Sequence, residues 1–190
     1  PLAKEEVARL AVLAECASDS VMIDDQVVLF AQREASVLEV FGLQLPSMLV
    51  LGCDTAPEEE VDTLRLPPAP YDSSEIARFG VLRAALRRAV AKADVALLGR
   101  VATASARINQ RYLPKPRLET LLRLCAEHGG CGVQVAHSGT VAGLIFDARA
   151  EHVGEDIERC AAALSHAGLA VTGVIDPVGH GGYPPARVSA

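Results

Sequence analysis

The segment from Val133 to Phe146 constrains the fold more than any other part of the chain. Two runs of β-prone residues meet there at a loop of small residues, and this pattern predicts a hairpin over residues 132–147. The loop carries a histidine, hydroxyl side chains and glycines, which let a backbone approach a ligand closely. Such a loop suits a polar or anionic ligand, but an ordinary strand connection has the same composition. The elements around the hairpin therefore decide what it means.

Those surrounding elements follow a definite order. Ser47–Cys53 is short, apolar and punctuated by glycine, so it predicts a buried strand, and Leu169–Ile175 predicts another. Apolar residues at helical spacing predict helices around residues 76–90, 95–108, 116–128 and 153–164. The order is strand, helices, strand, strand, helix, strand. We therefore predict an α+β fold, a ferredoxin-like (split βαβ) sandwich with extra helices in its first crossover.

The first 45 residues have a different pattern. Apolar residues at helical spacing predict a helix over residues 2–16. After a mixed segment through Phe30, we predict a second helix that ends at Phe41, because Gly42 is a natural stop. With no strand expected before the first helix, this region resembles the back part of a larger architecture.

Local signals mark the connections between the predicted helices. Ser73 or Ser74 is expected to cap the helix that follows, and Pro116 suits a first helical position because its missing N–H costs nothing there. Between them lies the polar loop of residues 109–116, in which we expect Lys115 to face solvent.

Composition narrows the classes of function. The net charge is −6 and only 4% of residues are aromatic, so a nucleic-acid partner is not expected. No apolar run reaches membrane-spanning length, so we expect no membrane contact. Five cysteines without a CxxC pair favour a reduced cytoplasm. Cys125, His128 and Cys131 have the residue types of metal ligands, but Cys125 falls on an apolar helical stripe, so we predict a core cysteine and no metal site of this kind.

Three stretches carry a family resemblance. They are Ile108–Pro116, Val135–Leu144 and the tripeptide Ser18-Asp19-Ser20 after a helix that contains Glu15. Together they resemble the GHMP kinase superfamily, and within it the branch of propanediol-utilisation kinases that includes the L-threonine kinase of cobalamin synthesis. The second stretch resembles that superfamily's third, glycine-rich motif.

The resemblance implies a phosphotransferase that moves a phosphoryl group from ATP, with Mg²⁺, to a small-molecule hydroxyl, and L-threonine is the leading acceptor. It also implies three regions. Residues 1–45 would be a helical remnant of the GHMP kinase N-terminal domain, residues 46–178 the ferredoxin-like C-terminal domain, and residues 179–190 a flexible tail.

One departure from the family is serious. GHMP kinases wrap the ATP phosphates with a loop of the type P-x-G-x-G-L-S-S at a helix N-terminus, where backbone N–H groups hold anions. The 190 residues contain no such segment, and we expect it to precede Pro1. The chain is then expected to be a fragment, a split-gene product or a relict that binds without turnover, because removing even one preorganised donor costs about 3 kcal/mol.

Candidate site residues follow from the resemblance. Asp19 is expected to accept or orient the proton of the acceptor hydroxyl, or to help hold the metal, although an Asp in this context also serves as a helix cap or turn residue. Asp24 and Asp25 are near enough in the sequence to take its role, or else they are solvated carboxylates. His137 would bind an acceptor carboxylate or phosphate, or else it is a strand-end histidine bonded to backbone. The predicted substrate contacts are His137, Ser138, Gly139, Thr140, Gly143 and Asn109, with Gln110 and Arg111 nearby.

Two functions from different classes remain open. One is the kinase, or its C-terminal portion, and the other is a non-catalytic module that binds a small ligand or assembles with another subunit. Because truncation exposes surface that a missing part would cover, we also expect a homodimer or a partner chain that supplies the N-terminal portion.

Overall fold

The computed structural model describes residues 2–58, 69–136 and 139–179. The chain divides into two compact units, Pro1–Leu45 and Pro46–Ala190. In chain order, the elements of the first unit are α1 (Lys4–Glu15), β1 (Val27–Ala31) and β2 (Ser36–Gly42). Those of the second are β3 (Met48–Asp54), α2 (Ser73–Lys92), α3 (Val95–Asn109), α4 (Leu118–Glu127), β4 (Gly132–Val135), β5 (Val141–Asp147), α5 (Val153–His166) and β6 (Ala170–Ile175).

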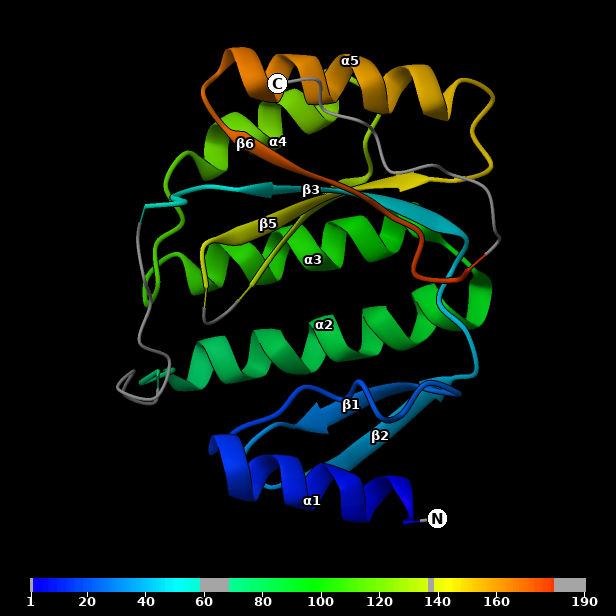
Figure 1. Ribbon diagram of the computed structural model, residues 1–190, viewed down its shortest axis with the longest axis vertical. Helices are drawn as coiled ribbons and strands as arrows, with labels where there is room; N and C mark the ends of the chain where they lie inside the picture. Colours follow the sequence, from blue (N-terminus) through cyan, green and yellow to red (C-terminus); the bar gives the residue numbers. More distant parts are fainter. Residues whose placement is uncertain (1, 59–68, 137–138, 180–190) are drawn as a thin grey trace. The chain divides into compact units, whose positions relative to one another are not determined.

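The second unit is built on one antiparallel sheet. Its strands lie in the order β4-β5-β3-β6, so β3 runs through the interior between β5 and β6. Numbered within the unit, this order is 2-3-1-4, which is the strand order of a split βαβ sandwich. The predicted ferredoxin-like fold is confirmed, and α2 and α3 are the extra helices of the first crossover (Figure 1).

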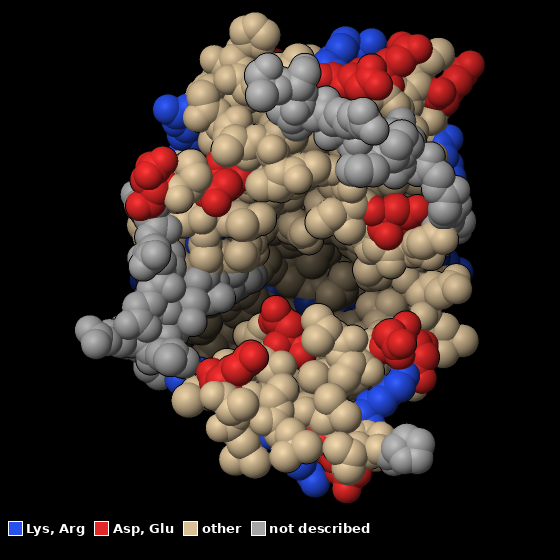
Figure 2. Space-filling view, viewed as in Figure 1, with Lys and Arg blue, Asp and Glu red and all other residues tan. Residues whose placement is uncertain are grey.

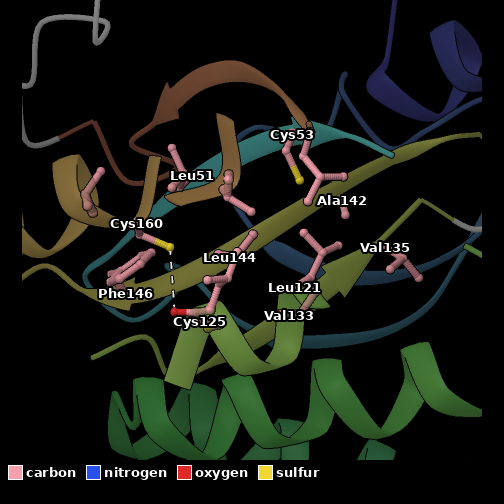
Figure 3. Packing of buried hydrophobic residues seen from close by; sticks show 14 of the residues in the cluster. Leu51, Cys53, Leu121, Cys125, Val133, Val135, Ala142, Leu144, Phe146 and Cys160 are labelled. Atoms are coloured by element: carbon pink, nitrogen blue, oxygen red, sulfur yellow. Dashed lines mark hydrogen bonds between the residues drawn. The ribbon is translucent and has the colours of Figure 1, made fainter. Parts of the chain in front are cut away.

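Helices α4 and α5 cover one face of this sheet. Alternate residues of β3, Leu49, Leu51 and Cys53, share a cluster with apolar residues of both helices, as the two-residue period of a strand requires. Figure 3 shows this packing, with Leu121 of α4 and Phe146 of β5 among the side chains. Every member of the cluster is under 9% exposed, so this face is the core of the unit.

Helix α3 lies beside the edge strand β4. The approach is so close that a Cβ on Gly99 of α3 would overlap the backbone at Cys131, and one on Gly132 would overlap the backbone of Gly99. Only glycine permits backbones to meet in this way. The hydroxyl of Thr103 then accepts a hydrogen bond of 3.0 Å from the N–H of Val133, so α3 covers this part of the sheet edge.

Helix α2 packs along α3 and begins with a complete capping box. Asp72, rather than the expected Ser73 or Ser74, is the cap: its carboxylate accepts from the N–H groups of Ser74 and Glu75. The carboxylate of Glu75 accepts in return from the N–H of Asp72 at 3.0 Å. The prediction chose the wrong residue because Asp and Ser cap equally well, and only the reciprocal glutamate distinguishes them.

In the first unit, the prediction of a second helix is wrong. Residues 27–31 and 36–42 form the antiparallel strands β1 and β2, joined by a turn in which Ala35 has a φ of 49°. The β-branched Val27, Val28, Val37 and Val40 fit a pleated strand better than a helix. The first helix, α1, is confirmed.

The described residues have two further properties that concern the surface of the protein. None of their helices is both long enough and apolar enough to cross a membrane. On the face shown in Figure 2, the acidic side chains of the described residues form small separate groups, and basic side chains do not gather there into a continuous patch.

Candidate functional site

The described residues bury four polar or charged side chains: Thr55, Glu75, Asn109 and Lys115. Asn109 ends α3 and Lys115 lies in the loop that follows it. Glu75 is bonded to that loop, and Thr55 is bonded to the hairpin loop between β4 and β5. We call these four residues the polar cluster. Because burying a polar group costs free energy unless it finds a partner, their concentration in one region marks it for a role beyond packing.

The hairpin between β4 and β5 carries most of the predicted substrate contacts. The N–H of Ala136 donates to the carbonyl of Val141 at 2.9 Å and closes the hairpin. His137 and Ser138 lie outside the described residues. The carbonyl of Thr140 accepts from both the N–H and the hydroxyl of Thr55, at 3.0 and 2.7 Å, so the loop is fixed to the end of β3.

Lys115 joins the two stretches that carry most of the family resemblance. Its side chain is only 2% exposed, and its Nζ donates to the carbonyl of Gly139 in the hairpin loop. Burial lowers the pKa of this lysine below its usual 10.5. The expectation that Lys115 faces solvent is therefore wrong. The flanking prolines gave no sign of burial, and lysine is so rarely buried that exposure is the default for a single sequence.

The loop that contains Lys115 is held by hydrogen bonds between its own residues. Gln110 both accepts from the N–H of Lys115, at 2.9 Å, and donates to its carbonyl, at 2.8 Å. The neighbouring Asn109 ends α3 and is 4% exposed, and within the described part of the chain its Nδ2 has no hydrogen-bond partner. A buried amide without a partner is rare in folded proteins, so the lack of one among the described residues makes Asn109 notable at the place where a substrate contact was predicted.

Glu75 anchors the same loop from α2. Its carboxylate accepts from the hydroxyl of Tyr112 at 2.5 Å and from Nη1 of Arg111 at 2.6 Å. The Tyr112 hydroxyl is the main reason that the pKa of Glu75 lies below its usual value, and the same bond raises the pKa of Tyr112. The sequence analysis missed this network, because nothing in the sequence indicates that residues 36 and 37 positions apart pair.

A groove of about 600 Å³ lies between α2 and α3. Its polar lining is three arginines, Arg78, Arg107 and Arg111, with Ser74 and Glu75, and apolar side chains of α2 and α3 line the rest. Guanidinium groups bind carboxylates and phosphates, so the groove adds cationic lining next to the polar cluster. Arg111 was a predicted substrate neighbour, whereas Arg78 and Arg107 were not singled out.

Gly143 sits within the sheet rather than in the hairpin loop. It pairs with Gly52 on β3 and Gln134 on β4, and a Cβ there would lie 2.6 Å from Cγ1 of Val50. This close approach gives the glycine a packing reason that is independent of any ligand.

Asp19 belongs to the first unit. Its carboxylate accepts from Nε2 of Gln32, and the side chain is exposed. The neighbouring Ser18 is fixed to the same residue, since its N–H donates to the carbonyl of Gln32 at 3.0 Å. Asp19 is thus held at the end of β1 with one carboxylate oxygen engaged.

The cysteines of the second unit belong to the core and its border. Cys125 is 2% exposed within the α4 face of the cluster, as predicted, and burial raises its pKa to about 11. The thiol of Cys160 donates to the carbonyl of Leu124 at 3.8 Å (Figure 3). Among residues 2–58, 69–136 and 139–179, no three His, Cys, Asp or Glu side chains gather as metal ligands would.

Comparison with known proteins finds similarity to GHMP kinases. Residues 83–169 match the family model of the GHMP kinases C-terminal domain. The chain is 38% identical over 109 residues to L-threonine kinase of Citrobacter freundii, a match that covers 51% of this chain and 38% of that protein. It is 50% identical over 50 residues to L-threonine kinase of Salmonella typhimurium, covering 26% of this chain and 17% of that protein. These matches span well under two thirds of either relative.

Solved structures share the fold at low sequence identity. The homoserine kinase of Cytophaga hutchinsonii superposes with a TM-score of 0.61 at 14% identity, over 92% of this chain and 57% of that one. The mevalonate kinase of Staphylococcus aureus superposes with a TM-score of 0.59 at 18% identity, over 94% and 60%. The chain is therefore similar to GHMP kinases: residues 83–169 match the model of their C-terminal domain, and the two curated relatives named above are L-threonine kinases.

Proposed function

We propose that this chain forms the acceptor side of an ATP-dependent small-molecule kinase whose acceptor is L-threonine. The observation that carries the proposal is the bond from Lys115 to Gly139, which joins the loop after α3 to the hairpin loop. Both segments belong to the stretches that resemble the family, and the identity to an L-threonine kinase supports the choice of acceptor.

The hairpin loop and the loop after α3 would bind the acceptor. Phosphoryl transfer depends mainly on positioning and on stabilising charge, so hydrogen-bond donors held in place are what this site must supply. Gly139 and Thr140, with His137 and Ser138 before them, would lie near the transferring phosphate. The Asn109 amide, which has no partner among the described residues, would donate to the acceptor, and the guanidinium of Arg111 would favour its carboxylate. Gly143 would support the hairpin from within the sheet.

Asp19 is the proposed catalytic residue. With one carboxylate oxygen bonded to Gln32, the other is available to orient the acceptor hydroxyl or to bind Mg²⁺. Mg²⁺ is commonly held by one or two carboxylates together with substrate phosphates, so a single aspartate fits the role without a cluster of protein ligands. The metal would supply charge neutralisation to the phosphates of ATP.

The direct test is ADP release with L-threonine as acceptor, with detection of O-phosphothreonine by mass spectrometry. L-serine, L-homoserine and D-threonine serve as matched acceptors. The assay uses the full translation product of the gene, whatever its length, beside the 190-residue chain. If the complete product releases ADP but phosphorylates another acceptor, the choice of threonine is wrong. If it phosphorylates none, the kinase proposal fails.

Replacing Asp19 separates catalysis from binding. Asp19→Asn is expected to lower turnover by about 100-fold or more while the KM for L-threonine changes little, because the amide keeps the shape and loses the charge. Asp25→Asn, a carboxylate that instead pairs with Lys4 at 2.8 Å, is the matched control. Equal activity of Asp19→Asn and the native chain would remove Asp19 from the mechanism.

The non-catalytic alternative is tested by calorimetric titration with ATP, because a module that only assembles with another chain has no need of the nucleotide. Exposed apolar side chains in the first unit favour assembly with a second copy or a partner chain, and they include Leu10, Leu13, Leu38 and Val40. Light scattering at high concentration checks this, and a monomer would contradict it.

A further inference from the structure

Glu75 is held by more bonds than its place in a capping box requires. The box uses only Oε2, which accepts from the N–H of Asp72 at 3.0 Å. The same oxygen accepts from the hydroxyl of Tyr112 at 2.5 Å, and Oε1 accepts from Nη1 of Arg111 at 2.6 Å. The residue is 5% exposed, and glutamate is rarely buried this deeply unless it is paired. Oε1 therefore serves Arg111 and not the helix cap.

Arg111 is held at one end and exposed at the other. Its Nη1 bonds to Glu75, and its Cζ lies 5.2 Å from the centroid of the Tyr112 ring, so two contacts restrain the guanidinium. The side chain is nevertheless 60% exposed, and it lines the groove between α2 and α3. A guanidinium has five N–H donors, of which the bond to Glu75 uses one. The exposed donors are therefore presented to the groove in a restrained orientation, which reduces the ordering cost of binding an anion.

The charges that line the groove favour an anion. Arg78, Arg107 and Arg111 bring three positive charges, and Glu75 brings one negative charge. A second carboxylate, that of Asp72, lies 3.8 Å from Nη1 of Arg111, near the limit of an ion pair. A carboxylate accepts two parallel hydrogen bonds from one guanidinium, so it matches this lining in both charge and shape. The groove therefore suits the carboxylate group of a small molecule.

We propose that Glu75 is a positioning residue that, by holding Nη1 of Arg111, orients the rest of this guanidinium for the carboxylate of an amino-acid acceptor. The inference rests on the proposed kinase function, and it adds a residue that does not itself touch the acceptor. The hydroxyl of Tyr112 holds the pKa of Glu75 below its usual 4.5, so the carboxylate stays charged at neutral pH. A charged partner keeps the bond to Arg111 strong. The site is then expected to distinguish a carboxylate from its neutral amide through Glu75 as well as through Arg111.

The first experiment compares L-threonine with L-threoninamide as acceptors for the full translation product of the gene. The native protein is expected to prefer L-threonine by about 100-fold in kcat/KM, because the amide loses a charge-assisted pair of hydrogen bonds. Glu75→Gln is expected to raise the KM for L-threonine by about tenfold, to change kcat by no more than about twofold, and to leave the KM for L-threoninamide level. The reason is that binding energy which does not change during phosphoryl transfer affects KM alone.

Two further variants separate positioning from loss of stability. Asp94→Ala removes the carboxylate that accepts from the N–H of Leu97 at 2.8 Å, so α3 loses its cap while the groove lining is unchanged. This variant is expected to keep the native KM. Arg111→Lys keeps the charge and loses the planar fork. Because Glu75 acts through Arg111, adding Glu75→Gln to Arg111→Lys is expected to change the KM by no more than about twofold.

The second experiment does not depend on turnover. Calorimetric titration with L-threonine gives the Kd of the same protein and its variants, at a temperature well below their unfolding midpoints. Glu75→Gln is expected to bind about tenfold more weakly than the native protein, and Asp94→Ala equally well.

The outcomes separate this inference from the proposed function. If L-threonine binds in a Glu75-dependent way but is not phosphorylated, the kinase proposal fails and the positioning role stands. If it is phosphorylated and Glu75→Gln keeps the native preference for L-threonine over its amide, the positioning role is wrong and the kinase proposal stands. The positioning role is also wrong if Asp94→Ala weakens binding as much as Glu75→Gln does, because the effect then comes from lost stability. Absence of both binding and transfer overturns both proposals.

Discussion

Two regions of the second unit are buried in different ways. The face of the sheet under α4 and α5 buries apolar side chains such as Leu51, Leu121 and Phe146, which need no specific partner. The polar cluster, Thr55, Glu75, Asn109 and Lys115, buries hydrogen-bonding groups whose partners must be placed individually. Apolar burial is non-directional, whereas a buried polar group is costly when its geometry fails. The first region therefore supplies stability, and the second fixes the positions of individual groups near the predicted site.

The largest expected effect tests the apolar face. Phe146→Ala should lower the free energy of unfolding by about 3–5 kcal/mol, because the residue is 1% exposed and its removal leaves a cavity. Urea denaturation measures this. Ile76→Ala, at an exposed position of α2, is the control and should change stability by no more than about 0.5 kcal/mol. A loss below about 1 kcal/mol at Phe146 would mean that this face is not the main source of stability.

A second substitution tests the sheet where a ligand role was also predicted. Gly143→Ala should cost about 1–3 kcal/mol, because the new Cβ meets Cγ1 of Val50 at 2.6 Å. Gly80→Ala is the matched control: no atom lies within 4 Å of its Cβ, so this change within α2 should stabilise by about 0.5–1 kcal/mol. If Gly143→Ala keeps full stability and loses activity, Gly143 serves the substrate and not the packing.

The polar cluster should show a pH dependence that the apolar face lacks. The pKa of Glu75 is held below its usual 4.5, first by the hydroxyl of Tyr112. A carboxyl whose pKa is lower in the folded state stabilises above its unfolded value, and this contribution is lost as the pH falls through the folded value. Glu75→Gln should therefore be less stable than the native chain at pH 7, and the difference should shrink below pH 4.5.

Tyr112→Phe provides the companion to that measurement. It removes the strongest single cause of the lowered Glu75 pKa and leaves Arg111 in place, so it should reproduce part of the change. Thermal unfolding monitored between pH 3 and 7 gives both curves. The native chain and Glu75→Gln could instead lose stability in parallel as the pH falls. In that case the bonds to Glu75 contribute nothing measurable to stability.

The smallest expected effect concerns the reactivity of cysteines in the apolar face. Burial raises the pKa of Cys53 to about 11 and that of Cys160 to about 12, so little thiolate forms at pH 8. Iodoacetamide at pH 8 should modify the exposed Cys16 first and reach Cys53 and Cys160 only when the unit unfolds. Mass spectrometry of digested protein measures this. Equal rates at all three would show that the core opens readily.

The same contrast explains what a single sequence could predict. The strands and helices of the second unit were predictable because apolar periodicity reports directly on which face is buried, and the strand order followed from the sequence of elements. Residues 27–42 misled the prediction because β1 is apolar throughout and β2 is of mixed polarity, so neither short strand shows a clear two-residue alternation.

The polar cluster was harder to predict from the sequence than the apolar face, for a physical reason. Asn109 was predicted as a contact and lies in the cluster, but the burial of Lys115 and its bond to Gly139 depend on segments far apart in the sequence. The hydrogen bond between Glu75 and Tyr112 likewise joins residues far apart in the sequence. Pattern rules describe local periodicity, whereas directional bonds between distant loops are set by the tertiary fold. The catalytic role of Asp19 and the roles of all six predicted substrate contacts stay predictions.

The contact between α3 and β4 has a consequence for handling the protein. An uncovered outer strand presents free backbone groups on which another molecule can add its own strand, which is the first step towards fibrils. With the backbone of Gly99 against Gly132, and the N–H of Val133 bonded to Thr103, a second molecule finds little room there. Replacing either glycine should push the helix outward and expose the edge of β4, so the variant should precipitate sooner on storage than the native chain.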